Sequence, residues 1–179
     1  MAHPRTLIRH AVVAQLTGAT AAGARVFKAR VVPFKQSELP AVAVYTPDEE
    51  VETSRSSAPR ELERSLQLVI EGVTESGAPS DVDDSADELA LEIEAAIDSD
   101  TTLNGTATDV LLSRTESDSF AESGKNHGLV RLTFTVYYET YAPMTAPAAD
   151  DFNTADIRHD LSGEQDTADQ AHDRVTVQE

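Results

Sequence analysis

Hydrophobic and polar positions follow a helical period in two segments of the chain. The first runs from Pro4 to about Leu16, and the second begins at residue 81 or at Ser85 and ends near Ile97. In both segments the apolar residues recur every three or four positions and form one stripe. Ser85, with Glu88 three residues later, predicts a capping box at the start of the second helix.

Other segments alternate with a period of two, which is typical of strands with one buried face. They cover residues 25–32, about 61–70, about 107–114 and 129–142. The intervening stretch LPAVAVY, residues 39–45, is too apolar to expose either face and predicts a further strand. Two polar stretches separate these strands and are interpreted as loops: residues 46–59 and 115–128.

The order of these elements is helix, three strands, helix and two strands. Hairpin-length connections between most strands favour an α+β fold, with an antiparallel or mixed sheet of about five strands and both helices packed on one face. Residues 1–142 are predicted to form this domain. Residues 143–179 are predicted to be an acidic C-terminal arm or tail, because residues 150–179 carry nine acids, two arginines and a single aromatic residue.

The charge of the chain is strongly negative and unevenly distributed. The net charge of −18 argues against a nucleic-acid-binding protein, because affinity for phosphates comes mainly from Lys and Arg. The first 45 residues nevertheless contain only one acid, Glu38. They contain six cations: Arg5, Arg9, Arg25, Lys28, Arg30 and Lys35. A molecule with one basic edge and an acidic remainder is suited to bind copies of itself head to tail or to dock on a charged partner. The alternative is a surface whose separated positive and negative charges only contact solvent.

The sequence predicts no catalytic residues, no cofactor and no metal site. The absence of cysteine excludes a disulfide, a thiolate nucleophile and a cysteine-ligated metal. The five histidines lack metal-ligand spacing and are interpreted as surface residues. The acidic run at residues 81–88 lacks the spacing of a calcium loop and suits a helix N-terminus instead. No apolar run is long enough to span a bilayer, and the first 16 residues are interpreted as mature sequence.

Four segments together resemble a known family. They are the first helix, the pair RVFKARVVPFKQSELPAVAVYTPDEE, the passage DDSADELALEIEAAIDSDTTLNGTATDVLLSRTE and the closing strand LVRLTFTVYYETY. This succession, over about residues 4–142, resembles the tail terminator (tail completion) family of long-tailed bacteriophages, of the lambda minor tail protein U type.

The resemblance implies a structural virion protein and not an enzyme. Its subunits would form a ring, usually a hexamer, that caps the tail tube, ends its polymerisation and joins it to the head or neck. The implied partners are further copies of the chain, the tail tube protein and a neck or head completion protein. DNA would pass through without specific binding, and no membrane is involved. The implied location is the head-proximal end of the virion tail, after synthesis in the host cytoplasm.

The strand face that carries Lys28 and Arg30 is predicted to meet an acidic face of the next subunit. The loops 46–59 and 115–128 are candidates for contacts with the tube or neck, because long polar loops on a rigid sheet commonly carry binding sites. The predicted interface residues are Arg25, Lys28, Arg30, Lys35, Asp48, Glu49, Glu50, Arg131, Thr133 and Thr135.

Other functions stay open at this point. A neck or head–tail joining protein would share the ring but bind a different partner. A small non-catalytic binding domain or a small enzyme would need a pocket with converging polar groups. An acidic regulatory protein would use its tail to mimic DNA.

Overall fold

The computed structural model describes residues 2–57, 59–122, 124–142, 154–160 and 170–176. The chain divides into two units, Met1–Ala142 and Pro143–Glu179. In the second unit two strands, β7 (Thr154–Asp160) and β8 (Gln170–Thr176), pair antiparallel. The sequence predicted no strands there, and the rest of the predicted arm lies outside the described residues.

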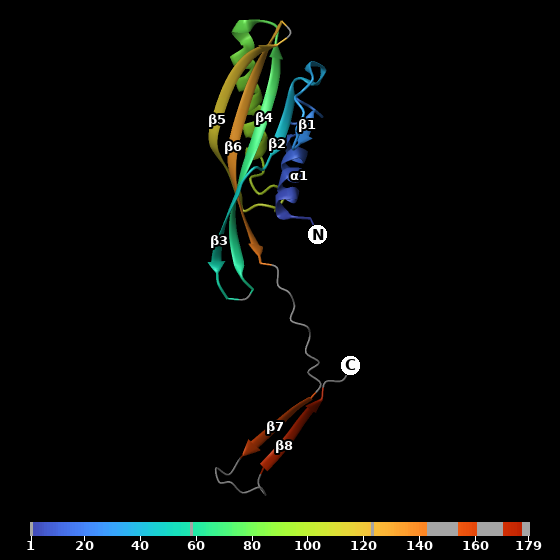
Figure 1. Cartoon of the computed structure of the whole chain (residues 1–179), viewed down its shortest axis with the longest axis vertical. Coiled ribbons are helices and arrows are strands. Elements are labelled where there is room, and N and C mark those ends of the chain that lie inside the picture. Colours follow the sequence, from blue (N-terminus) through green and yellow to red (C-terminus); the bar gives the residue numbers. More distant parts are fainter. Residues whose placement is uncertain (1, 58, 123, 143–153, 161–169, 177–179) are drawn as a thin grey trace. The chain divides into compact units, whose positions relative to one another are not determined.

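The first unit is an α+β fold with two α-helices and a mixed sheet of six strands (Figure 1). The helices are α1 (Pro4–Leu16) and α2 (Val82–Asp98). The strands are β1 (Val26–Lys28), β2 (Ala41–Tyr45), β3 (Glu49–Arg55), β4 (Glu61–Ser76), β5 (Asp109–Glu122) and β6 (Lys125–Tyr141). The strand order is β1-β2-β4-β6-β5, and β3 pairs with the first part of β4. Within this sheet β1 and β2 pair parallel, and the other described pairs are antiparallel.

The core lies between the sheet and the two helices. In the middle of β4 and β6 the even-numbered residues, 66–74 and 128–138, face the helices and are buried, whereas the odd-numbered residues face the opposite side. Buried side chains of α1, α2, β2, β4 and β6 form one cluster that includes Ile8, Val44, Ile70, Ile93 and Phe134. One cluster with contributions from both helices places them on the same face of the sheet, as the sequence predicts.

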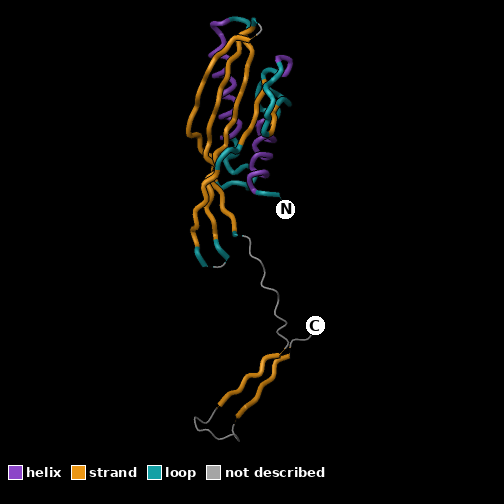
Figure 2. The backbone as a smooth tube through the Cα atoms, in the orientation of Figure 1, coloured by secondary structure: helices purple, strands orange, loops and turns teal. Residues whose placement is uncertain are grey.

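The strands β4, β5 and β6 are longer than the sequence pattern predicts, and both predicted loops are wrong. Residues 46–59 contain β3, which pairs with β4 from Glu49↔Leu66 to Arg55↔Glu61. Residues 115–128 belong to the long β5–β6 hairpin. These parts of the strands are exposed on both faces and carry mostly polar side chains. They therefore show no apolar alternation, and their sequence is typical of loops. Figure 2 shows β3, β4 and β6 continuing past the helices.

The first predicted strand, residues 25–32, is by contrast shorter in the structure than the sequence predicts. β1 ends at Lys28, because the next residue, Ala29, has a φ of 47° and turns the backbone into the left-handed region. The predicted capping box is wrong as well. Asp81 precedes the first turn of α2, and the Ser85 hydroxyl lies inside the helix, 2.8 Å from the Val82 carbonyl oxygen.

Candidate assembly surface

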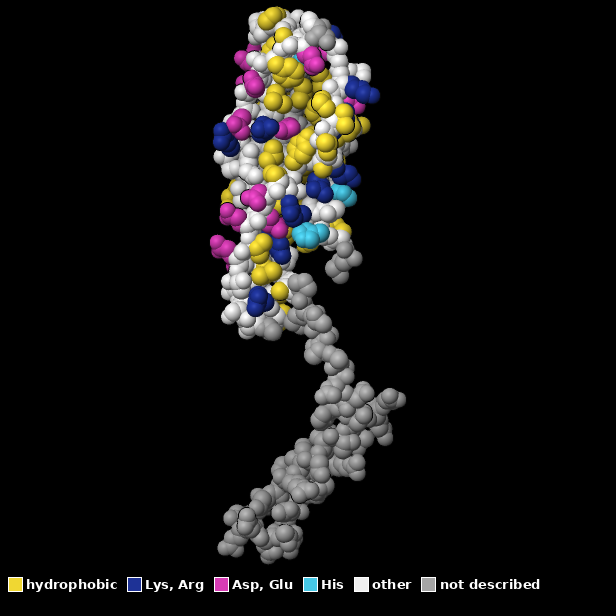
Figure 3. Space-filling model, in the orientation of Figure 1, with side chains coloured by type: hydrophobic (Ala, Val, Ile, Leu, Met, Phe, Trp, Pro, Cys, Tyr) yellow, Lys and Arg dark blue, Asp and Glu magenta, His cyan; other side chains and the backbone are white. Residues whose placement is uncertain are grey.

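The odd-numbered face of the sheet has no helix over it and carries three connected hollows. We call this surface, formed by the residues lining the three hollows, the trough. Neighbouring hollows share Tyr45 and Glu71, and then Gln67, Ser113 and Thr133. Figure 3 shows that hydrophobic side chains gather over one end of this face, whereas charged side chains are scattered over the rest. An apolar end that continues into a polar floor is typical of a surface that contacts another protein.

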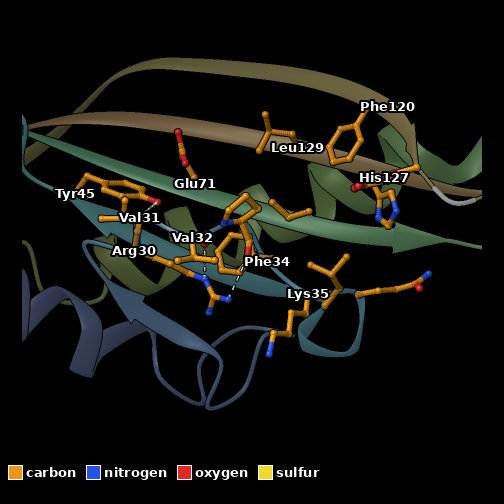
Figure 4. A pocket seen from close by; sticks show the side chains of 15 residues that line it. Arg30, Val31, Val32, Phe34, Lys35, Tyr45, Glu71, Phe120, His127 and Leu129 are labelled. Carbon is orange, nitrogen blue, oxygen red and sulfur yellow. Dashed lines mark hydrogen bonds between the residues drawn. The ribbon is translucent and has the colours of Figure 1, made fainter.

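The apolar end of the trough is a groove of about 520 Å³. One wall is residues 30–36, which follow β1 and which we call the strap. Figure 4 shows that Val31, Val32 and Phe34 of the strap and Phe120 and Leu129 of the β5–β6 hairpin line the groove. Val31 is 95% exposed and Val32 is 66% exposed. Adjacent valines so open to solvent are costly in an isolated subunit, and their burial against a partner would be favourable.

Arg30 holds the strap in place. Its guanidinium forms an ion pair with Glu38 at 2.6 Å and lies over the rings of Phe27 and Phe34, 4.6 and 4.9 Å from their centroids. The hydroxyl of Tyr45 donates to the Arg30 carbonyl oxygen at 3.0 Å. The sequence predicts that Arg30 meets an acidic face of the next subunit, whereas in the structure its guanidinium is paired with Glu38 of the same chain.

The carboxylate of Glu38 receives two kinds of donor. The backbone N–H of Lys35 donates to it at 2.7 Å, and the Arg30 guanidinium adds an ion pair. These contacts lower the pKa of Glu38, the Lys35 backbone hydrogen bond most of all. The strap is thus fixed at both ends by one carboxylate.

His127 is buried, and the prediction that it is a surface histidine is wrong. Its ring stacks on Phe120 from the neighbouring strand, with centroids 5.1 Å apart. Among the described residues its Nδ1 atom finds no hydrogen-bond partner. Extending the odd-position alternation backwards from Leu129 would have placed His127 on this face of the sheet.

The polar part of the trough gathers several of the predicted interface residues. Arg131 pairs with Glu71 across the β4–β6 ladder at 2.6 Å, which raises the pKa of Arg131. Further along, one shallow hollow of about 210 Å³ is lined by five predicted residues: Asp48, Glu49, Glu50, Thr133 and Thr135. The strand β3, which the sequence analysis missed, brings the three acids beside the two threonines.

Glu49 differs from its two acidic neighbours, because its carboxylate is engaged within the chain. It accepts a hydrogen bond from the hydroxyl of Tyr138 and pairs with Arg64 at 2.8 Å. Its side chain is 9% exposed. Burial, and then the hydrogen bond to Glu49, raise the pKa of Tyr138. Glu49 therefore ties β3 to the sheet, whereas Asp48 and Glu50 are exposed.

Arg25 and Lys28 do not line any of the hollows in the described part of the trough. Arg25 donates from Nε to the Pro40 carbonyl oxygen at 2.8 Å, and the Lys28 Nζ lies 3.4 Å from the His10 Nε2. The predicted interface residues thus divide into two sets, one in the trough and one beside α1. Lys35 and Arg30 belong to the first set.

The described residues contain no group of three or more His, Asp or Glu that is arranged to hold a metal ion. Within the same ranges, no helix is long and apolar enough to cross a membrane.

A family model described as phage minor tail protein U matches residues 3–138 of the chain. The protein belongs to this family. Membership makes it a structural component of a phage tail, and the matched range coincides with the helices and the six-stranded sheet of the first unit. No curated protein matches the chain.

The solved structures that match include one from a virion. The chain is similar to a chain in the virion of a native gene transfer agent (GTA) particle. The two are 15% identical, with a TM-score of 0.39, and the match covers 74% of this chain and 94% of that one.

Proposed function

We propose that the protein forms a ring that caps the phage tail tube, ends its polymerisation and joins it to the head or neck. The observation that carries the proposal is the family match to a phage minor tail protein over residues 3–138. Ring closure and the head-proximal position follow from the resemblance of the sequence to tail terminators.

The geometry of the trough supports an assembly role over a catalytic one. Its apolar groove offers Val31 and Val32 to solvent, and its polar part offers Asp48, Glu50 and Thr135. Two titratable side chains that line it are nearly buried in the described residues, His127 and Glu49. His127 stacks on Phe120 and its Nδ1 has no hydrogen-bond partner there, whereas Glu49 is held by Tyr138 and Arg64. A surface of this kind is suited to bind another protein.

Electron microscopy of particles assembled without the protein tests the proposal. Overlong tails separate from filled heads are the expected result, because nothing would end polymerisation of the tube. Adding back the wild-type protein during assembly should restore tails of uniform length. Tails of normal length that fail to join heads would contradict the capping role and assign the protein to the neck. Normal particles would contradict both assignments.

A further inference from the structure

The main path of the sheet ends in two edge strands, β1 and β5, and the further edge strand β3 pairs with β4 alone. Each helix lies over a different part of the sheet. α1 packs over β1 and β2, whereas α2 packs over β4, β5 and β6. Figure 1 shows α1 beside β1 at one edge and β5 at the other. Each edge therefore combines one outer strand with one helix.

The edge formed by β1 and α1 is basic. We call its four cations the basic edge: Arg5, Arg9, Arg25 and Lys28. In the described part of the chain none of the four pairs with a carboxylate. Arg5 and Arg9 donate to the Thr46 carbonyl and hydroxyl oxygens at 2.6 and 3.0 Å. These hydrogen bonds hold the side chains in place and leave their charges uncompensated.

The opposite edge is acidic on both faces of the sheet. Three exposed acids alternate along β5 on the helix-free face: Glu116, Asp118 and Glu122. On α2, Glu92 faces α1, because it accepts a hydrogen bond from the Ala21 N–H beside that helix. Four acids share the opposite side of α2: Asp83, Asp87, Glu94 and Asp98. We call these seven residues the acidic edge.

The acidic edge is nearly free of internal compensation. Within the described residues only Glu116 of the seven forms an ion pair, with Arg114 at 2.8 Å, and both side chains are exposed. Figure 3 shows acidic side chains along the β5 side of the molecule and Lys, Arg and His side chains near α1. The subunit is therefore electrically polar from one sheet edge to the other.

We propose that the acidic edge of one copy docks on the basic edge of the next copy. The inference rests on the proposed ring and names the surfaces that close it. Two different patches make a heterologous contact, which builds a ring if the rotation closes and a filament if it does not. Arg30 takes no part, because Glu38 already neutralises it.

Pairing of two identical edges is disfavoured by the same charges. The edge strand β5 is 14 residues long and its outer side is open. Two β5 strands side by side would bring Glu116, Asp118 and Glu122 of both copies together, and like charges across a strand pair are destabilising. The acids protect β5 from self-association and leave a basic surface as the complementary partner.

Charge reversal of the full chain tests this contact. Lys28→Glu alters the basic edge, and Asp87→Lys with Asp118→Lys alters the acidic edge. All three residues are exposed, so each variant should unfold at the wild-type temperature. Mass photometry and sedimentation velocity at about 0.1 M salt should show association weakened by about tenfold or more in each variant alone. Raising the salt to about 1 M should weaken association of the wild type too.

Mixing the two variants supplies the sharper result. In a head-to-tail contact, the carboxylate introduced by Lys28→Glu in one variant would face the lysines introduced in the other, while the remaining wild-type edges still match. The mixture should regain assembly with the two variants alternating, and a chain carrying all three substitutions should also assemble. Arg60→Glu with Glu139→Lys reverses two exposed charges elsewhere on the unit and is the matched control, which should assemble like the wild type.

The outcomes separate this contact from the proposed function. Rings that form equally well in all variants overturn the edge contact and leave the ring standing. Loss of assembly in both variants without recovery in the mixture also overturns it, because complementarity is then not the cause. A wild type that stays monomeric at every concentration and salt overturns the contact together with the ring.

Discussion

The two faces of β4 and β6 are made from alternate residues of the same strands, yet they differ in nearly every physical property. On the helix side Leu68, Ile70 and Phe134 are at most 1% exposed. On the opposite face of the same strands, Glu71 and Arg131 form a partly exposed ion pair on the floor of the trough. A single step along these strands thus separates a buried side chain from a partly exposed one. Substitutions on the helix side should report on stability, and those on the trough side on partner binding.

The largest expected effect is on the helix side. Phe134→Ala removes a ring from the centre of the core and should lower the free energy of unfolding by about 3–5 kcal/mol, through lost burial and the cavity left behind. Urea denaturation followed by circular dichroism measures this change. Thr135→Ala, the next residue on the trough side, is the control and should change it by less than about 0.5 kcal/mol. Similar losses for both would contradict the division between the faces.

A second effect depends on the close approach of α2 to the sheet. A Cβ atom added at Gly128 would lie 2.8 Å from the Val82 carbonyl oxygen and 3.0 Å from the Ala86 Cβ. The backbone of the first turn of α2 would have to move, so Gly128→Ala should cost about 1–3 kcal/mol of stability. Thermal unfolding can measure it against Gly77→Ala, whose added Cβ would meet nothing within 4 Å. A Gly128→Ala protein as stable as Gly77→Ala would contradict the observed packing distance.

A smaller effect concerns the strap, on the other side of the sheet. Because the folded state lowers the pKa of Glu38, its ionised form stabilises the fold above the ordinary value of 4.5, and that contribution is lost as pH falls through the lowered pKa. Glu38→Gln should therefore be less stable than the wild type near pH 7, and the difference should shrink in acid. Urea denaturation at a series of pH values checks the trend. A difference independent of pH would rule out the charge as its cause.

The smallest effect on stability is expected at the groove. Val31→Ser combined with Val32→Ser should change the free energy of unfolding by less than about 0.5 kcal/mol, because both side chains are already exposed. The same variant should fail to restore tails of uniform length to particles that lack the protein. Full restoration would show that the groove is not a partner surface. Loss of folding would show instead that the strap belongs to the core.

Local patterns predicted much of the fold because they report burial directly. Both helices, the buried strand β2 and the clear alternation of β6 were predicted close to their observed positions. The strand β3 and the outer part of β5 were missed, because polar side chains on both faces leave no alternation to detect. The fold class is confirmed, and the interface remains a prediction.

The candidate surface was predicted as a set of residues but not as a place. Thr133 and Thr135 were assigned from their strand, and Asp48 and Glu50 from a supposed loop, and the β3–β4–β6 register brings all four to one hollow. Arg30 shows the opposite case. Alternation placed it on a strand face that meets the next subunit, whereas β1 ends at Lys28 and the Arg30 guanidinium pairs with Glu38 of the same chain.

The sequence by itself determined the buried stripe of each helix, the buried residues of β2 and β6 and the family, because periodicity and motif order are local properties of the chain. Tertiary structure alone decided which strands lie at the edges and which charges remain unmatched. Strand order depends on pairings between residues as far apart as Glu61 and Tyr141, and no local pattern encodes them. The basic and acidic edges exist only because that order places β1 and β5 at opposite ends of one sheet.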